Sequence, residues 1–174
     1  MTESIDSSPD SNKPKRSTYE RALDMLEARS RAVTELRRLL IKKGEPPIDV
    51  DAAIARLRDN GLLDDANFAR QLTRSKAIGG GHSRRRIQQE LAKRGVARDV
   101  SDEAIAEVFE DEEVDEAASI ERVARKKLRT LSGADAPTQK RRLYGFLARR
   151  GFDADDIQRV LRLVLTKKLD DESD

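Results

Sequence analysis

The chain contains the pentapeptide LIKKG at residues 40–44, and close copies of it follow as LAKRG at residues 91–95 and LARRG at residues 147–151. The three glycines are 51 and 56 residues apart. In each copy a leucine and a basic pair precede the glycine, which is typical of the last turn of an amphipathic helix. Self-similarity at a spacing of this size indicates an array of repeated units rather than one irregular core.

The agreement between the copies extends outward from the glycines. An aliphatic residue stands eight positions before each glycine, at Leu36, Ile87 and Leu143, and others stand ten and thirteen positions after it. From residue 18 onward apolar residues recur with a period of 3.6, and no stretch alternates with a period of two. The pattern predicts an all-α protein of about nine helices, arranged as three tandem three-helix repeats in an elongated, curved stack.

The composition and the residues that are expected to start and end helices divide the chain into five segments. Ser, Asp, Asn, Pro and Lys are frequent in residues 1–17, which predicts a disordered tail. The helical part is predicted to comprise a first repeat with a leading helix (18–78), a second repeat (79–132) and a third repeat (133–168), followed by an acidic tail (169–174). Helices are predicted to end at Gly44, Gly61, Gly95, Gly133 and Gly151, and to begin at Asp49, Asp64, Ser83, Asp99 and Asp153.

The composition excludes several classes of protein. Charged residues make up 39% of the 174 residues, yet 35 basic and 33 acidic side chains leave a formal net charge of only +2. The absence of cysteine excludes disulfides and thiolate chemistry, and the single histidine, His82, argues against a histidine-bound zinc ion or histidine-based catalysis. No apolar run approaches the ~20 residues that span a bilayer, and no signal peptide is evident. We expect a cytoplasmic, monomeric protein that is not an enzyme, does not bind a membrane and uses no cofactor or metal ion.

Charge is sorted along the chain into blocks. Residues 68–98 carry nine basic side chains and one acidic one, residues 99–121 carry no basic side chain, and residues 122–150 are again basic. If the acidic helices share one side of the stack, the basic helices form a stripe on the other, which is typical of a surface for a polyanion or an acidic protein. The alternative is that the opposite charges pair within the chain, where each exposed pair contributes ~0–1 kcal/mol. The candidate residues of the contact stripe are Lys42, Lys43, Arg84, Arg85, Arg86, Lys93, Arg94, Lys140, Arg141, Arg142, Arg149 and Arg150.

One glycine-rich segment, GGGHSRRR at residues 79–86, offers a second type of site. Glycines followed by a helix N-terminus and three arginines could cradle a phosphate. However, the segment lacks the Gly-Lys-Ser/Thr ending of a P-loop, and no strand precedes it. A flexible hinge between units, capped by Ser83, is therefore the favoured interpretation. Asp64 and Asp65 are similarly interpreted as the beginning of a helix rather than as metal ligands.

Taken in order, these motifs resemble the RecX family of bacterial proteins, which regulate the recombinase RecA. The resemblance rests on an aromatic-x-x-Ala-Leu-x-x-Leu pattern at residues 19–26, on the glycine motifs, on GLLDDANFA at residues 61–69 and on LARRGF at residues 147–152. It covers residues 19–165. One departure concerns the second helix, where the family usually has Ser or Thr at the position of Ala32, so that Ser30 is the alternative cap.

The resemblance implies binding along the groove of the RecA–DNA filament, weak contact with DNA at most, and a role in DNA repair, recombination and the SOS response. It implies that the protein modulates, and mainly inhibits, the recombinase, ATPase and coprotease activities of RecA. The residues themselves leave two alternatives open. One is a direct nucleic-acid-binding protein that uses its helix–glycine-turn–helix units like a helix-turn-helix motif. The other is an adaptor that recruits a helical protein through its acidic helices.

Overall fold

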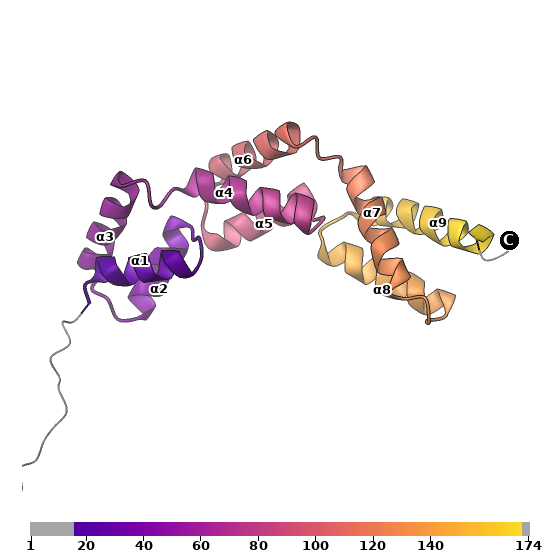
Figure 1. The fold of residues 1–174 in the computed structure, drawn as a ribbon, viewed down its shortest axis with the longest axis horizontal. Coiled ribbons are helices and arrows are strands. Elements are labelled where there is room, and N and C mark those ends of the chain that lie inside the picture. The colour runs from indigo at the N-terminus through magenta and orange to yellow at the C-terminus, as the bar shows by residue number, and fades with distance from the viewer. Residues whose placement is uncertain (1–15, 172–174) are drawn as a thin grey trace, which may run out of the picture.

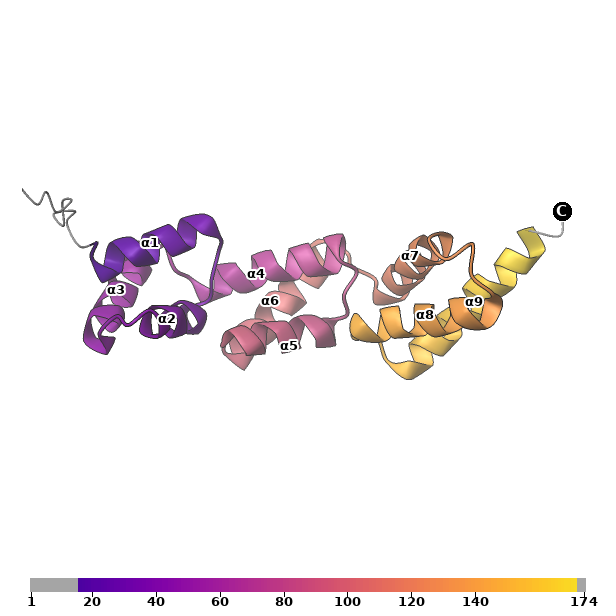
Figure 2. The same cartoon turned by 90° about the horizontal axis from the view of Figure 1, so that it is seen from below.

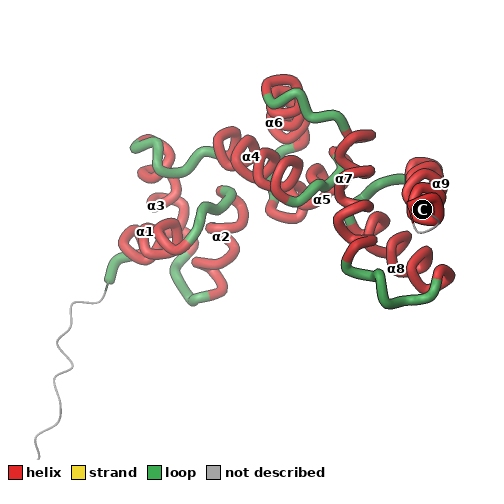
Figure 3. The backbone as a smooth tube through the Cα atoms, turned by 45° about the vertical axis from the view of Figure 1, so that its right-hand side comes forward, coloured by secondary structure: helices red, strands yellow, loops and turns green. Residues whose placement is uncertain are grey.

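The computed structural model describes residues 16–171, which form an elongated, arched molecule (Figure 1; turned by 90° in Figure 2). Within this range the chain forms nine α-helices joined by short loops and contains no strand, which confirms the predicted fold class (Figure 3). Most of the predicted disordered tail, 1–17, and the end of the predicted acidic tail, 169–174, lie outside the described residues.

The helices pack in three units of three. The first unit contains α1 (Thr18–Ala28), α2 (Val33–Lys42) and α3 (Pro47–Asp59). The second contains α4 (Asp65–Arg74), which continues into the π-helical turn η1 (Ser75–Gly79), then α5 (Arg84–Arg94) and α6 (Arg98–Asp111). The third contains α7 (Glu116–Arg129), α8 (Ala136–Arg149) and α9 (Ala154–Asp171).

Each unit has its own apolar core, and the aliphatic positions of the repeat stand at its centre. The aliphatic residue eight positions before each glycine and the leucine of each pentapeptide lie four residues, or about one turn, apart on the middle helix, so both face inward. These six side chains are 0% exposed: Leu36, Leu40, Ile87, Leu91, Leu143 and Leu147. Full burial of such a side chain contributes about 1.5–3 kcal/mol, so the repeat marks strongly stabilising positions of each unit.

The grouping of the helices differs from the expected segments 18–78, 79–132 and 133–168. Those boundaries place the helix at 64–78 with the first repeat, whereas Phe68 of α4 is buried in the core of the second unit. Likewise, Ile120 of α7 is buried in the core of the third unit. The units divide instead at the short loops before α4 and before α7. An amphipathic stripe does not specify which neighbour covers it, and here the following unit does.

Most of the residues that were predicted to start or end a helix do so. Gly44, Gly61, Gly95 and Gly151 have positive φ values, as helix-ending glycines require, but Gly133 does not. Asp64, Ser83 and Asp153 accept backbone hydrogen bonds at the starts of α4, α5 and α9, which confirms these caps. Asp49 and Asp99 lie within the first turn of α3 and α6 rather than before it, because Pro47 opens α3 and Arg98 opens α6.

Candidate interaction surface

The middle helices of the three units, α2, α5 and α8, follow one another along the length of the molecule (Figure 2). They lie on the lower side of the arch in Figure 1, whereas α6, which carries six acidic residues and one basic one, lies on the upper side. All three middle helices are basic: α2 has three basic residues and one acidic, α5 has five and one, and α8 has four and none. We call this succession of helices the basic row.

The first two helices of the row meet end to end. The carbonyl of Gly95, at the end of α5, accepts a hydrogen bond of 3.1 Å from the Thr34 hydroxyl in the first turn of α2. Gly95 has φ +83°, and a Cβ atom at this position would lie 2.5 Å from the Thr34 Cβ. Glycine is therefore required here both by the backbone conformation and by the close approach of the two units.

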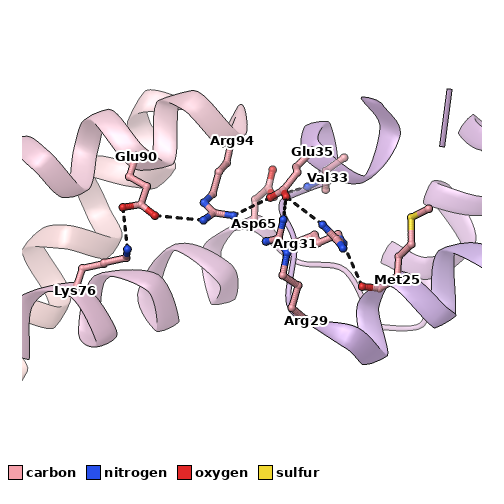
Figure 4. Close-up of polar contacts among 9 residues, drawn as sticks. All are labelled: Met25, Arg29, Arg31, Val33, Glu35, Asp65, Lys76, Glu90 and Arg94. Carbon is pink, nitrogen blue, oxygen red and sulfur yellow. Dashed lines mark hydrogen bonds and ion pairs between the residues drawn. The ribbon is translucent and has the colours of Figure 1, made fainter. Parts of the chain in front are cut away.

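A chain of ion pairs spans the same junction (Figure 4). Arg94 of α5 donates to Glu35 of α2 at 3.0 Å and to Glu90 of its own helix at 3.2 Å. Glu35 also accepts from Arg29 and Arg31, and Glu90 pairs with Lys76 at 3.1 Å. Arg94 therefore joins the first unit to the second instead of facing solvent.

The environment of Glu35 and Glu90 favours their ionised forms. Burial raises the pKa of the Glu35 carboxyl, but the hydrogen bonds and charges of Arg29 and Arg94 outweigh it and bring the pKa below the ordinary value. Burial likewise raises the pKa of Glu90, and Lys76 and Arg94 together lower it further than burial raises it. Both carboxylates thus hold their charge within the junction.

The second unit also caps a helix of the first. Ala32 stands at the N-cap of α2 without a side-chain hydrogen bond, and Ser30 does not replace it. Instead, the carboxylate of Asp65 in α4 accepts a hydrogen bond of 2.8 Å from the Val33 backbone N–H. Burial raises the pKa of Asp65, against the lowering effect of this bond. The Ala32 side chain is buried in the core of the second unit, so the loop before α2 joins both cores.

The second and third units repeat this end-to-end arrangement. The Ser83 N–H, at the start of α5, donates to the carbonyl of Arg150, at the end of α8, at 3.0 Å. A Cβ atom on Gly151, whose φ is +87°, would lie 2.5 Å from the Arg86 Cβ and 2.6 Å from the Ser83 Oγ. Each bond of this type pairs a carbonyl at the end of one middle helix with a donor at the start of the preceding middle helix.

Arginine side chains also form bonds between the second and third units. Arg85 donates to the Gly151 carbonyl at 3.1 Å, and Arg150 donates to the Gly80 carbonyl at 3.0 Å. The Arg84 guanidinium lies over the ring of Phe109, 4.0 Å from its centroid, and its backbone N–H donates to Glu116 of α7 at 2.9 Å. The Arg85 and Arg150 bonds hold the end of α8 against the start of α5, and the Arg84 N–H joins that start to α7.

The glycine-rich segment belongs to this junction and is neither a phosphate loop nor an open hinge. Gly81 is buried at φ +58°, and a Cβ atom there would lie 2.3 Å from a methyl group of Val123 in α7. His82 is half-buried, and burial lowers its pKa, with the nearby positive charges of Arg150 and Lys76 acting in the same direction. The favoured interpretation of a flexible hinge is therefore replaced by a packed contact.

The twelve candidate residues divide into two groups. One group builds the junctions and comprises Arg84, Arg85, Arg86, Arg94 and Arg150. The other group is exposed on the three helices of the row and at the end of α2, and within residues 16–171 none of its members forms an ion pair. This second group, which we call the exposed basic set, comprises Lys42, Lys43, Lys93, Lys140, Arg141, Arg142 and Arg149.

The acidic residues that hold the junctions, Glu35 and Glu116, were not predicted from the sequence. A signal was present, because Glu35 and Glu90 are the lone acidic residues of otherwise basic helices. The alternative that opposite charges pair within the chain is correct for some of the basic residues. Arg70 and Arg74 of α4 pair with Glu107 of α6 and with Glu112, which follows α6, at 3.4 Å and 2.6 Å.

Family models cover most of the chain and fall on the three units. The first, second and third three-helix domains of RecX match residues 19–57, 64–105 and 113–161. The chain belongs to the RecX family. Each match begins at the first helix of a unit, near α1, α4 and α7.

Curated relatives in the RecX family match nearly the whole chain. "Regulatory protein RecX" of Pelodictyon phaeoclathratiforme (strain DSM 5477 / BU-1) is 36% identical over 163 residues, which are 94% of this chain and 97% of that protein. "Regulatory protein RecX" of Mycobacterium avium (strain 104) is 40% identical over 148 residues, 83% of each chain. These relatives are named as regulatory proteins.

Solved structures of the RecX family share the fold. The crystal structure of RecX from Lactobacillus salivarius superposes with a TM-score of 0.63 at 20% identity, over 84% of this chain and 94% of that one. A crystal structure of regulatory protein RecX gives a TM-score of 0.65 at 22% identity, over 82% of this chain and 70% of that one. The three-unit arrangement is therefore an arrangement found in experimental structures.

No group of three or more imidazole and carboxylate side chains between residues 16 and 171 is placed to hold a metal ion. No helix in the same range is both long enough and apolar enough to cross a membrane.

Proposed function

We propose that this protein binds the RecA–DNA filament along its basic row and modulates, mainly by inhibition, the recombinase, ATPase and coprotease activities of RecA. Membership of the RecX family, whose curated members are named regulatory proteins, supports the regulatory role. The observation that carries the proposal is the end-to-end row of three basic helices with an unpaired, exposed basic set. In this proposal the protein acts in the cytoplasm as a monomer, without a cofactor and without catalysis of its own.

The junctions make the row suitable for an extended partner. At 1.5 Å per residue, the helices α2, α5 and α8 laid end to end extend over about 50 Å. A filament presents the same surface repeatedly, so basic side chains on successive units engage equivalent acidic groups or phosphates. Each further contact then forms within one complex at high effective concentration, which raises the overall affinity.

Direct reading of a DNA sequence fits the geometry less well. A recognition helix must enter the major groove and present several side chains to base edges. Here the two ends of α5 are occupied, because Arg94 binds Glu35 and Arg85 binds the Gly151 carbonyl. The end of α8 is occupied in the same way by Arg150, which binds the Gly80 carbonyl. The basic row supplies charge along a line, which suits a repeating surface rather than one short sequence.

The test is the ATPase activity of RecA on single-stranded DNA while this protein is titrated. We expect the ATPase rate to fall as the protein is added, and we expect binding to bare DNA at ~0.15 M salt to be weak by mobility shift. Strong, sequence-selective binding to bare DNA without an effect on RecA would overturn the proposal in favour of a direct DNA-binding protein. A stoichiometric partner other than RecA, with no effect on the ATPase, would favour the adaptor instead.

A further inference from the structure

The three copies of the glycine motif have the same backbone conformation but different surroundings. Gly44, Gly95 and Gly151 end α2, α5 and α8 with φ values of +86°, +83° and +87°. Gly95 and Gly151 pack against the first turn of the preceding middle helix, where a Cβ atom would lie 2.5 Å from another residue. A Cβ atom on Gly44 would meet nothing within 4 Å. The first unit therefore carries the same turn without a neighbouring unit in contact with it.

The residues around the Gly44 turn also differ from those of the other copies. Three positions before the glycine stands Ile41, where the second and third copies have Ala92 and Ala148. Four positions after it stands Ile48, where the second copy has Asp99 and the third also has an aspartate.

These isoleucines face solvent. Ile48 is 78% exposed, the highest value among the exposed large apolar side chains of the described residues, and Ile41 is 36% exposed. An isolated exposed apolar residue is ordinary, but these two stand on either side of one glycine turn at the end of the row, so apolar side chains are exposed there beside the basic pair. We call Ile41, Lys42, Lys43, Gly44 and Ile48 the end surface.

We propose that the end surface docks on a helix N-terminus of the partner protein, in the way that the Gly95 turn docks on the start of α2. The proposal rests on the proposed function, so the partner helix belongs to the protein filament. The inner junctions indicate the chemistry that fits: a donor in the first turn for the glycine carbonyl, as Thr34 provides, and a carboxylate for the basic pair, as Glu35 provides. The end surface adds apolar contact through its two isoleucines.

Charge and polarity favour protein over the other candidate occupants. Lys42 and Lys43 alone would fit phosphate, but a nucleic-acid backbone gives Ile41 and Ile48 no apolar partner. A second copy of this chain offers no free equivalent of the start of α2. α2 and α5 already receive Gly95 and Gly151 at their first turns. α8, with 14 residues, begins with a further turn that includes Pro137, and Gln139 is buried there, bound to the carbonyls of Leu131 and Ala134.

Two substitutions test the proposal without disturbing the chain's own packing. Gly44→Asn adds a side chain at the docking point, and asparagine tolerates the left-handed conformation of a helix end. Ile48→Asp introduces the residue type that the second copy has at Asp99, in the first turn of a helix where an acidic residue is favourable. The matched controls are Gly61→Asn, at another exposed positive-φ glycine with nothing within 4 Å, and Leu62→Asp, at a 52% exposed leucine.

The measurement is the concentration of each protein that half-inhibits the RecA ATPase, together with thermal unfolding of each variant. Inserting a side chain into a packed contact weakens binding about tenfold or more, so we expect Gly44→Asn and Ile48→Asp to need about tenfold more protein than the controls. Equal inhibition by all four variants and the unmodified protein would overturn the inference and leave the proposed function standing. Failure of the unmodified protein to inhibit would overturn the proposed function and this inference with it. Self-association that Gly44→Asn abolishes, with inhibition unchanged, would identify a second copy as the occupant and likewise overturn the inference.

Discussion

The substitution Gly95→Ala, compared with Gly44→Ala, isolates the contribution of the first junction to stability. The two glycines end equivalent helices, share the motif and have nearly equal φ values, +83° and +86°. They differ in their neighbours, because a Cβ atom on Gly95 would lie 2.5 Å from the Thr34 Cβ and 2.6 Å from its methyl carbon, whereas one on Gly44 would meet nothing within 4 Å. The pair therefore separates the cost of the backbone conformation from the cost of the contact between units.

The expected loss of stability in each variant is the sum of the cost of the backbone conformation and the cost of the contact between units. Placing alanine in the left-handed conformation costs roughly 1–2 kcal/mol at either position. Overpacking against Thr34 adds about 1–3 kcal/mol at Gly95 alone. We therefore expect the free energy of unfolding to fall by about 1–3 kcal/mol more in Gly95→Ala than in Gly44→Ala, and each kcal/mol lowers Tm by about 2–4 °C in a chain of this size.

Urea and thermal unfolding followed by far-UV circular dichroism measure the difference. Gly151→Ala is a second test, since its Cβ atom would lie 2.5 Å from the Arg86 Cβ, and it should behave like Gly95→Ala. Equal losses of stability in Gly44→Ala, Gly95→Ala and Gly151→Ala would refute the end-to-end packing of the middle helices. The glycines would then serve only to end their helices.

Three further predictions concern the cores and the first junction. Leu91→Asp or Leu147→Asp places a charge at a 0% exposed position and should lower the free energy of unfolding by several kcal/mol, about 3 or more, in thermal unfolding, whereas Leu62→Asp should change it by about 0.5 kcal/mol or less. Glu35→Gln removes the charge that binds Arg29, Arg31 and Arg94 and should cost about 1–3 kcal/mol in urea unfolding at neutral pH; no change would mean that the ion pairs do not hold the units together. The pKa values of Glu35 and Glu90 are lower in the folded protein than in the unfolded chain, so their ionised forms stabilise the fold. This stabilisation is complete at pH values above the pKa of the unfolded chain, and it is lost as the pH falls below about 4.5 and through the pKa values of the folded protein. Glu35→Gln/Glu90→Gln should flatten this loss in unfolding curves measured against pH, and an equally steep loss would contradict the assignment.

Much of the fold could be predicted from the sequence because two strong local signals agree. The apolar period of 3.6 and the glycine motifs located all nine helices of the described residues, and the positions that agree between copies, such as Leu40 and Leu147, lie at the centres of the cores. The assignment of α4 and α7 to units could not be predicted in the same way. A position in the sequence does not say which unit covers a side chain. Ala32, for example, directly precedes α2 of the first unit but is buried in the core of the second unit.

The candidate surface could be predicted only in outline. The basic pair before each motif glycine identified the helices of the row, but a sequence does not distinguish an arginine that faces solvent from one that binds a carbonyl. Arg149 and Arg150 are adjacent and chemically identical, yet Arg149 is exposed and Arg150 binds the Gly80 carbonyl of another unit. In the same way, Gly44 and Gly95 end closely similar motifs, and only the packing of the units shows that Gly95 contacts a neighbouring unit and Gly44 does not.

The most direct test of the basic row is the affinity of this protein for RecA filaments on single-stranded DNA after charge reversal. The variant Lys42→Glu/Lys93→Glu/Arg149→Glu changes one exposed basic residue at each middle helix. Its matched control, Arg58→Glu/Arg98→Glu/Arg162→Glu, changes one exposed arginine on the third helix of each unit, so the net charge is the same in both proteins. We expect the row variant to bind about tenfold more weakly than the control, which should stay close to the unmodified protein. Equal affinities of the two variants, with both folded, would contradict the assignment of the basic row as the surface that binds the filament.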